Sequence, residues 1–209
     1  MSCKKNHVNE IGLLNSMSVK GNCKGFTIVE VLVSIIIFSI GLIGIARLQV
    51  VSKQSNYDAV QRVTATTIAE EIIAKMRANT TQLAAYSGNG AGITLGRGSL
   101  ATPANKCDSD ASTCTEEQLY EYDLWEIERS LDGVTEQNTD GDSVGGLVSP
   151  TACINGPAVG GSGLYTIAIV WRGKTALSNP AAHTCGEDTG LYGDNNEYRR
   201  LLFFSVYIA

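Results

Sequence analysis

The sequence contains very little of the chemistry on which enzymes rely. Only two histidines occur among 209 residues. Neither His7, near the start, nor His183, in a polar loop, has neighbours in the pattern of a catalytic set. The glycine-rich stretch 88–98 lacks the GK[ST] ending and the strand–turn–helix setting of a phosphate-binding loop. We therefore expect no catalytic residues, no bound cofactor and no enzymatic activity.

Basic residues are scarce beyond the first segment. The whole chain carries a net charge of −5. Residues 1–25 contain four lysines against one glutamate, a net of +3, so residues 26–209 carry −8. An acidic surface repels the phosphates of DNA and RNA, so specific binding to nucleic acid is not expected.

Metal-ligand spacings are missing as well. The acidic runs 138–142 and 187–197 contain several side-chain oxygens, but they lack the placed glycine and the distal glutamate of an EF-hand loop. Solvated turns are the favoured interpretation of both runs, with calcium binding as the alternative. We predict no metal site.

The cysteines form no CxxC pair, which argues against a zinc site. Four of the six lie in the polar C-terminal part: Cys107, Cys114, Cys153 and Cys185. They indicate two disulfides in an oxidising compartment. Three pairings are possible. We favour Cys107–Cys114, because it closes a short loop, together with Cys153–Cys185, and the sequence leaves the other two pairings open.

One long apolar run is present. Residues 26–46 carry a single charge, Glu30, and as a helix they are long enough to cross about 30 Å of hydrocarbon. Lysines precede the run, which predicts a cytoplasmic N-terminus and a C-terminal domain on the outer side of the membrane. The basic segment ends at Gly25 before the apolar run begins, which reverses the order of a signal peptide cut after its apolar stretch.

The stretch KGFTIVE, residues 24–30, resembles the class III signal of type IV pilins and pseudopilins. In that family a membrane prepilin peptidase cuts after the glycine and methylates the new N-terminus. The resemblance implies a cleaved leader at 1–25, a cut after Gly25 and an N-methylated Phe26. Glu30 is then the fifth residue of the mature chain. The leader is long for the family, and Met17 is an alternative start.

Glu30 and Gly25 each have a second interpretation. Gly25 could be a flexible boundary residue, and Glu30 could be an acid that extends towards the lipid headgroups. An unpaired carboxylate within a span costs a few kcal/mol, so a partner is expected. The free amine of Phe26 on a neighbouring subunit is that partner in our interpretation, which makes Glu30 an assembly residue.

No proline interrupts residues 26–80, so one long helix is predicted. Its first part, 26–47, is the transmembrane or fibre-core half, and 48–85 is an amphipathic half. The residues predicted to form the buried face are Leu48, Val51, Ser55, Ala59, Val63, Thr66, Ile73 and Met76. Residues 68–79 resemble the helix end of PilV-type minor pilins.

Residues 86–209 form the predicted globular domain. A loop is expected at 86–106, and a helix from the Thr115–Gln118 capping box to Gly133. Strands are expected at 145–154, 163–171 and 201–208, in an antiparallel sheet against the amphipathic half-helix. This is an α+β, pilin-like fold, and the YTIAIVW strand and the strand after Arg199 also resemble PilV-type proteins.

The resemblance implies a minor pilin of the type IV pilus that primes assembly and modulates adhesion or motility. Its expected partners are other minor pilins, the major pilin, the prepilin peptidase and the inner-membrane assembly platform. The expected location is the inner membrane as a single-pass protein with a periplasmic domain, and then the fibre or its tip. The alternatives are a minor pseudopilin of type II secretion, and an adhesin whose loops 86–112 and 178–198 bind a surface.

Overall fold

The computed structural model describes residues 25–109, 113–141, 143–157 and 161–209. The expected leader up to residue 24, with the alternative start at Met17, lies outside the described residues. The chain divides into two compact units, Met1–Val51 and Ser52–Ala209, which are described separately below. The helix α1, Ile28–Ala78, contributes residues to both units.

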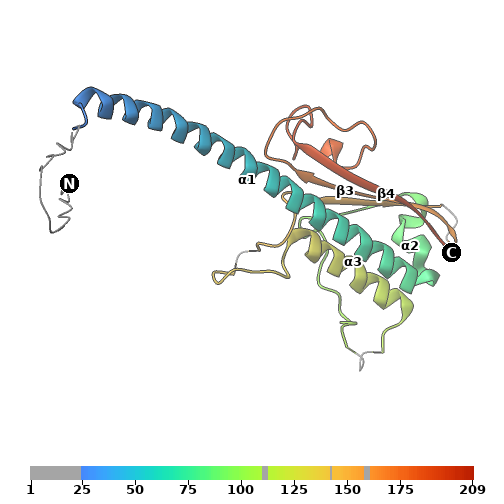
Figure 1. Cartoon of the computed structure of the whole chain (residues 1–209). Helices are drawn as coiled ribbons and strands as arrows, with labels where there is room; N and C mark the ends of the chain where they lie inside the picture. Colours follow the sequence, from blue (N-terminus) through green and yellow to red (C-terminus); the bar gives the residue numbers. More distant parts are fainter. Residues whose placement is uncertain (1–24, 110–112, 142, 158–160) are drawn as a thin grey trace, which may run out of the picture. The chain divides into compact units, whose positions relative to one another are not determined.

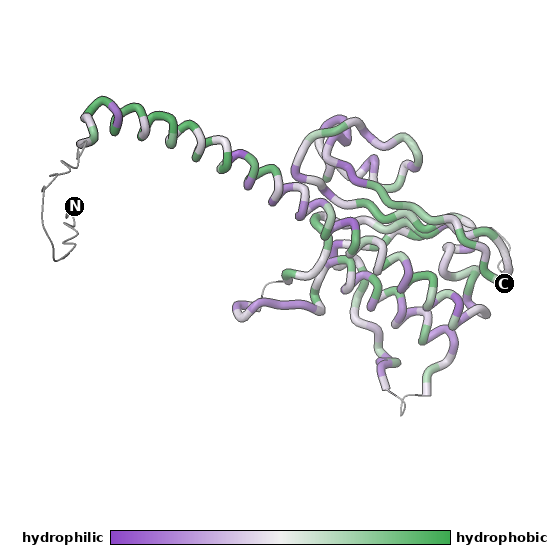
Figure 2. The backbone as a smooth tube through the Cα atoms, viewed as in Figure 1, coloured by the Kyte–Doolittle hydropathy of each residue, from purple (hydrophilic) through white to green (hydrophobic). Residues whose placement is uncertain are grey.

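The first unit consists, where described, of an apolar helical segment. Every residue from Gly25 to Val51 is exposed, including Phe26 and Ile28, at 76% and 81%. The helix is long and apolar enough, by length and composition, to cross a membrane, and Figure 2 shows the green apolar colouring that dominates this part of α1. This segment buries none of its own apolar surface, so it needs lipid or other chains around it.

The second unit is an α+β fold. Its helices are the remainder of α1, the short α2 at Leu83–Tyr86 and α3 at Glu116–Asp132. Its strands are β1 at Ile93–Leu95, β2 at Thr151–Asn155, β3 at Gly163–Arg172 and β4 at Arg199–Ile208. They form one antiparallel sheet in the order β1-β2-β3-β4. Short 3₁₀ turns occur at Thr80–Gln82, Gly88–Gly90 and Glu187–Thr189.

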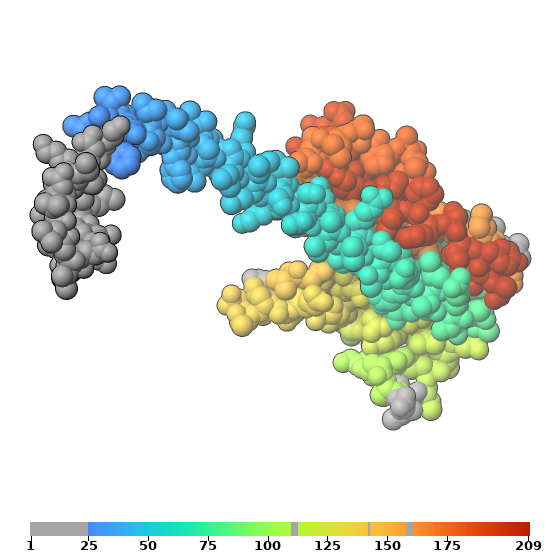
Figure 3. Space-filling view, in the orientation of Figure 1, coloured from blue at the N-terminus to red at the C-terminus, as the bar shows by residue number. Residues whose placement is uncertain are grey.

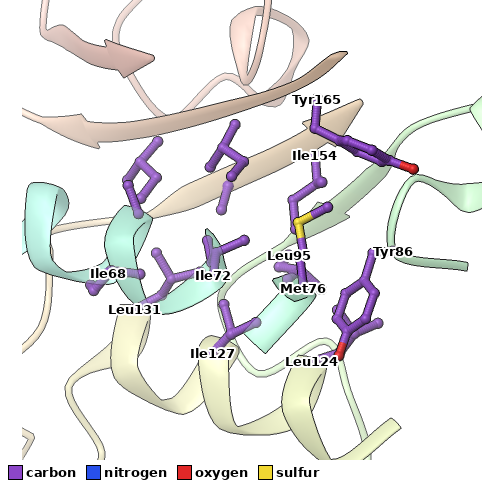
Figure 4. Close-up of a cluster of buried hydrophobic side chains, with 14 of the residues drawn as sticks. Ile68, Ile72, Met76, Tyr86, Leu95, Leu124, Ile127, Leu131, Ile154 and Tyr165 are labelled. Atoms are coloured by element: carbon purple, nitrogen blue, oxygen red, sulfur yellow. The ribbon is translucent and has the colours of Figure 1, made fainter. Parts of the chain in front are cut away.

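The core lies where α1 passes between the sheet and α3 (Figure 1). Figure 4 shows Ile72 and Met76 of α1 between Ile154 of β2 and Ile127 of α3. All four of these residues are completely buried. A helix with neighbours on two opposite sides must present small or apolar residues to both, which explains the alanines among its buried positions.

The predicted buried face of the amphipathic half-helix was wrong. Leu48, Val51 and Val63 are exposed, at 71%, 62% and 66%, and of the eight predicted positions Met76 is the one classed as buried. The buried residues are Gln61, Ala65, Ile68, Ala69, Ile72 and Met76. The spacing of large apolar residues gave the wrong face, because the small residues Ala65 and Ala69 and the polar Gln61 are buried while Leu48, Val51 and Val63 are exposed. Of the other predicted positions, Ile73 is partly buried and packs against the core.

The expected helix and antiparallel sheet of the domain are confirmed. The hydroxyl of Thr115 accepts a hydrogen bond from the Gln118 N–H at 3.2 Å, and the Gln118 side chain accepts one from the Thr115 N–H at 3.0 Å. Gly133, at φ 70°, ends α3. The strand expected at 145–154 begins only at Thr151, directly after Pro150, and β1 lies within the stretch 86–106 that was expected to be a loop.

Candidate functional site

The candidate site is the start of α1, with Gly25 and Phe26 just before the helix and Glu30 in its first turn. Gly25, Phe26 and Thr27 precede the helix, which begins at Ile28. The Glu30 N–H donates to the Thr27 hydroxyl at 3.2 Å, so Thr27 caps the helix. Its spacing from Glu30 is that of a capping box, a signal that the sequence analysis missed. A carboxylate in this first turn also faces the positive end of the helix dipole.

Glu30 lies in a shallow hollow on the surface of the helix. Phe26, Glu30, Val31, Ser34, Ile35 and Phe38 line this hollow, which has a volume of about 510 Å³. Glu30, Ser34 and Phe38 are spaced by four residues, so they share one face of the helix, and Phe26, just before the helix, lines the same hollow. Glu30 is the one charged residue of the lining, and two aromatic residues flank it.

The hydroxyls near Glu30 are satisfied within the helix. Ser34 donates to the backbone oxygen of Glu30, and Ser39 donates to that of Ile35, each at 2.7 Å. These serines therefore add little polarity to the surface. The Glu30 carboxylate is left as the group of this face that can bind a cation, and an ammonium group that approaches across the apolar surface is a fitting partner.

A second candidate surface consists of the loops 86–112 and 178–198, proposed above as an adhesive surface. The second loop is fixed by Arg199, whose side chain is completely buried. Its guanidinium donates to the oxygens of Asn179, Pro180, His183, Cys185 and Glu187. Glu187 therefore has a structural partner and is not a free carboxylate of the acidic run 187–197.

Two acids of α3 fix part of the first loop. The Glu128 carboxylate accepts hydrogen bonds from the N–H groups of Gly96, Ser99 and Leu100, at 2.7–2.9 Å, and from the Ser99 hydroxyl. Burial alone would raise the pKa of Glu128, but these four hydrogen bonds to the charged form hold it below its ordinary value. Asp132, one turn further along α3, accepts from the N–H groups of Arg97 and Gly98.

A group of charged residues lies between α1 and α3. The Lys75 ammonium is 3.2 Å from Asp123 and 2.5 Å from Glu126. Burial would lower the pKa of Lys75, but these two carboxylates raise it above its ordinary value. Tyr86 donates to Asp123, and burial together with that carboxylate raises the pKa of the Tyr86 phenol. This network joins α1, α2 and α3.

The structure contains two disulfides, Cys107–Cys114 and Cys153–Cys185. These are the pairs that the sequence analysis favoured. The second joins β2 to the loop that Arg199 fixes. Within the described part of the chain, no group of three or more histidine, cysteine, aspartate or glutamate residues is arranged to hold a metal ion. Asp142, in the first acidic run, lies outside the described residues.

Two protein families match adjoining parts of the chain. The prokaryotic N-terminal methylation motif matches residues 20–46, which include Gly25, Phe26 and Glu30. The family described as type IV pilin Tt1218 matches residues 47–125, from the middle of α1 into α3. No curated protein and no solved structure matches the chain.

Proposed function

We propose a minor-pilin function for this chain, which is a type IV pilin-like protein with an α+β pilin-like fold and an N-terminal methylation motif. In this proposal the prepilin peptidase cuts after Gly25 and methylates Phe26. Glu30 then pairs with the amine of Phe26 on a neighbouring subunit. One observation carries the proposal: Glu30 is the one charged group in an exposed apolar hollow between Phe26 and Phe38.

The physical reasoning concerns the free energy of a carboxylate in lipid. A charge inside a span costs a few kcal/mol unless it is paired. The amine that cleavage creates on a neighbouring Phe26 supplies a charge of opposite sign, and both groups lie at the start of identical helices. Pairing them offsets the cost and sets the register between adjacent helices as the subunit leaves the bilayer.

The proposed location follows from the apolar helix. Residues 26–47 cross the inner membrane once before assembly, with the lysines of the leader on the cytoplasmic side. The domain then lies in the periplasm, an oxidising compartment that suits its two disulfides. After assembly the same helix packs among other helices in the fibre, and the domain lies on the fibre or at its tip.

The proposed partners are the prepilin peptidase, the inner-membrane assembly platform, the major pilin and other minor pilins. The PilV-type resemblance of residues 68–79 supports a minor subunit that primes assembly and modulates adhesion or motility. The proposed role is structural, and Lys75, Glu128 and Arg199, which hold α1, α3 and the loops together, support it.

The runner-up is a minor pseudopilin of type II secretion, which would use the same signal and the same helix. Deletion separates the two: loss of twitching motility with normal secretion supports the pilus, and the converse supports the secretion system. The adhesin function remains compatible with either, but Arg199, Glu128 and the disulfides hold both candidate loops in place.

Mass spectrometry of the mature N-terminus tests the proposal. Protein from cells that contain the peptidase should begin at a methylated Phe26, and protein from cells without it should keep residues 1–25. An intact leader in both strains would overturn the proposal. Mature protein that is absent from sheared fibres would overturn the pilus assignment while leaving the processing step in place.

A further inference from the structure

The sheet has two very different edges. β1 forms one edge with only three residues, Ile93–Leu95, and Glu128 holds the Gly96 N–H that follows it. β4 forms the other edge with ten residues, Arg199–Ile208. In the described ranges, backbone hydrogen bonds from residues 201–208 join no segment other than β3. One backbone side of β4 is therefore open to a partner.

The open edge lacks the features that normally protect an edge strand. Residues 201–208 contain no charge and no proline, and their register with β3 is continuous, without a bulge. The two arginines at its start are engaged elsewhere, since Arg199 is buried and Arg200 donates to the oxygens of Thr175. Natural proteins rarely leave a long, flat, uncharged edge without a partner.

An apolar patch borders this edge on the outer face of the sheet. It consists of Leu164, Phe203 and Tyr207, which are 62%, 46% and 64% exposed, and Leu164 and Tyr207 are directly paired across β3 and β4. At the other end of the same face, Cys185 and Tyr192 cover Ala168 and Val170. Figure 3 shows atoms of this C-terminal strand, in red, at the molecular surface.

We infer that the β4 edge binds a strand from a different subunit of the same fold, as the next antiparallel member of the sheet. This inference rests on the proposed function, because it takes the partner from the assembly in which all helices point the same way. Backbone hydrogen bonds supply the pairing, and the patch of Leu164, Phe203 and Tyr207 receives apolar side chains of the added strand.

The direction of α1 excludes symmetric pairing of two copies through β4. Such pairing would place the strands antiparallel about a two-fold axis perpendicular to the sheet. That rotation also reverses the part of α1 that lies along the sheet in the second unit (Figure 1). Subunits of one fibre or one membrane cannot point their helices in opposite directions.

The alternating strand directions show which edge fits instead. Three antiparallel pairings separate β1 from β4, so these two strands run in opposite directions. A neighbour whose helix points the same way therefore presents its first-strand edge antiparallel to β4. In this chain that edge has three residues, too few to pair along a ten-residue strand, so we assign the partner strand to a subunit with a longer first strand.

Site-specific crosslinking in intact cells tests the inference on the full chain. A photoreactive amino acid replaces Ser205, which is exposed on β4, or Thr94, which is exposed on β1. The crosslinked peptides are identified from the sheared fibre fraction. We expect Ser205 to capture a strand peptide from another pilin-like protein, and Thr94 not to capture that peptide.

Lysine substitutions give a matched second measurement. Ser205→Lys adds a charge at the long edge and Thr94→Lys adds the same charge at the short edge. We expect Ser205→Lys to lower incorporation into fibres roughly tenfold and Thr94→Lys to leave it nearly unchanged. Resistance of the domain to protease shows that both variants fold.

The outcomes separate this inference from the proposed function. Absence of the unmodified chain from fibres overturns both. If the chain is present in fibres, the strand pairing alone is overturned when the probe at Ser205 captures nothing, a helix peptide, or a second copy of this chain. Equal incorporation of Ser205→Lys and Thr94→Lys into fibres would also overturn the strand pairing and leave the proposed function in place.

Discussion

The two units of this chain differ in whether the chain itself buries their apolar side chains. In the first unit, large aliphatic residues such as Ile36 are exposed on every side of the helix. In the second, Ile72 of the same helix is completely buried between a sheet and α3. The helix α1 thus has an N-terminal half that lipid or other chains must cover and a C-terminal half that the rest of this chain covers.

The polar groups follow the same division. In the described part of the first unit, residues 25–51, the hydroxyls of Ser34 and Ser39 bond to their own helix, and Glu30 is the one carboxylate. In the second, buried charges are paired with residues far away in the sequence, such as Glu128 with residues 96–100. The domain's stability is therefore internal, whereas the helix start depends on lipid or neighbours.

The largest expected effect on stability comes from removing the buried charge of Arg199, which holds the second loop, 178–198, in place. Arg199→Met leaves three backbone oxygens without a donor and Glu187 without its cation. The free energy of unfolding of the domain should fall by about 3–5 kcal/mol. Urea unfolding of the full chain in detergent measures this loss.

Arg200→Met is the control for this variant, because the Arg200 side chain is partly exposed and donates mainly to Thr175. It should cost much less than Arg199→Met. Similar losses in the two variants would contradict the role assigned to the Arg199 network.

The next effect compares one substitution at two positions of α1. Ile72→Ala removes a completely buried side chain and should destabilise the domain by about 2–5 kcal/mol. Ile36→Ala, at a residue 60% exposed, should leave domain unfolding unchanged. The same urea titration measures both, and a loss at Ile36 equal to that at Ile72 would mean that the helix unfolds as one unit.

A third variant tests the carboxylate that holds the first loop. Glu128→Gln keeps an oxygen acceptor but removes the charge, so it should cost about 1–3 kcal/mol near neutral pH. The pKa of Glu128 is lower in the folded protein than its ordinary value of 4.5. Its contribution is therefore complete above that pH and is lost as the pH falls through the folded pKa.

Unfolding at neutral pH and well below pH 4.5 checks this dependence. The difference between wild type and Glu128→Gln should shrink at the acidic pH, where the wild-type carboxyl also becomes neutral. A difference that is independent of pH would show that the ionised form of Glu128 does not hold the loop.

The sequence predicts the local features of both units better than the long-range ones. The capping box at Thr115, the end of α3 at Gly133 and the strand β3 depend on neighbouring residues, and these predictions are confirmed. The alternation expected for β3 fails at Ala168 and Val170, which the distant residues Cys185 and Tyr192 cover. The face of α1 that would be buried depends on which elements pack on it, and that prediction was wrong. β1 has only three residues, too few for an alternating pattern.

The same distinction holds for the functional residues. Glu30, Ser34 and Phe38 share a face because of helical spacing, which can be read directly from the sequence, as can the Thr27 cap. Arg199 and Glu128 gave no signal, because their partners lie 12–20 and 28–32 residues away. The processing at Gly25 and the pairing of Glu30 stay predictions.

A fourth variant acts on the first unit alone. Glu30→Ala should leave membrane insertion intact, because it removes the one charge of the span, and should leave domain unfolding unchanged. Incorporation into fibres should fall on the order of tenfold, since the amine of the neighbouring Phe26 loses its partner. Quantitative immunoblots of membrane and fibre fractions measure both steps, and normal incorporation would contradict the pairing.

The smallest effect contrasts the two helix caps. Thr115 caps α3 inside the domain, so Thr115→Ala should cost about 1 kcal/mol of domain stability. Thr27 caps α1 in the first unit, whose described residues 25–51 are all exposed, so Thr27→Ala should leave the unfolding of the domain unchanged. It should instead free the first turn and speed the hydrogen exchange of the Glu30 amide in detergent. A loss of domain stability in Thr27→Ala would show that the start of the helix and the domain fold together, and the division between the two units would then fail for stability.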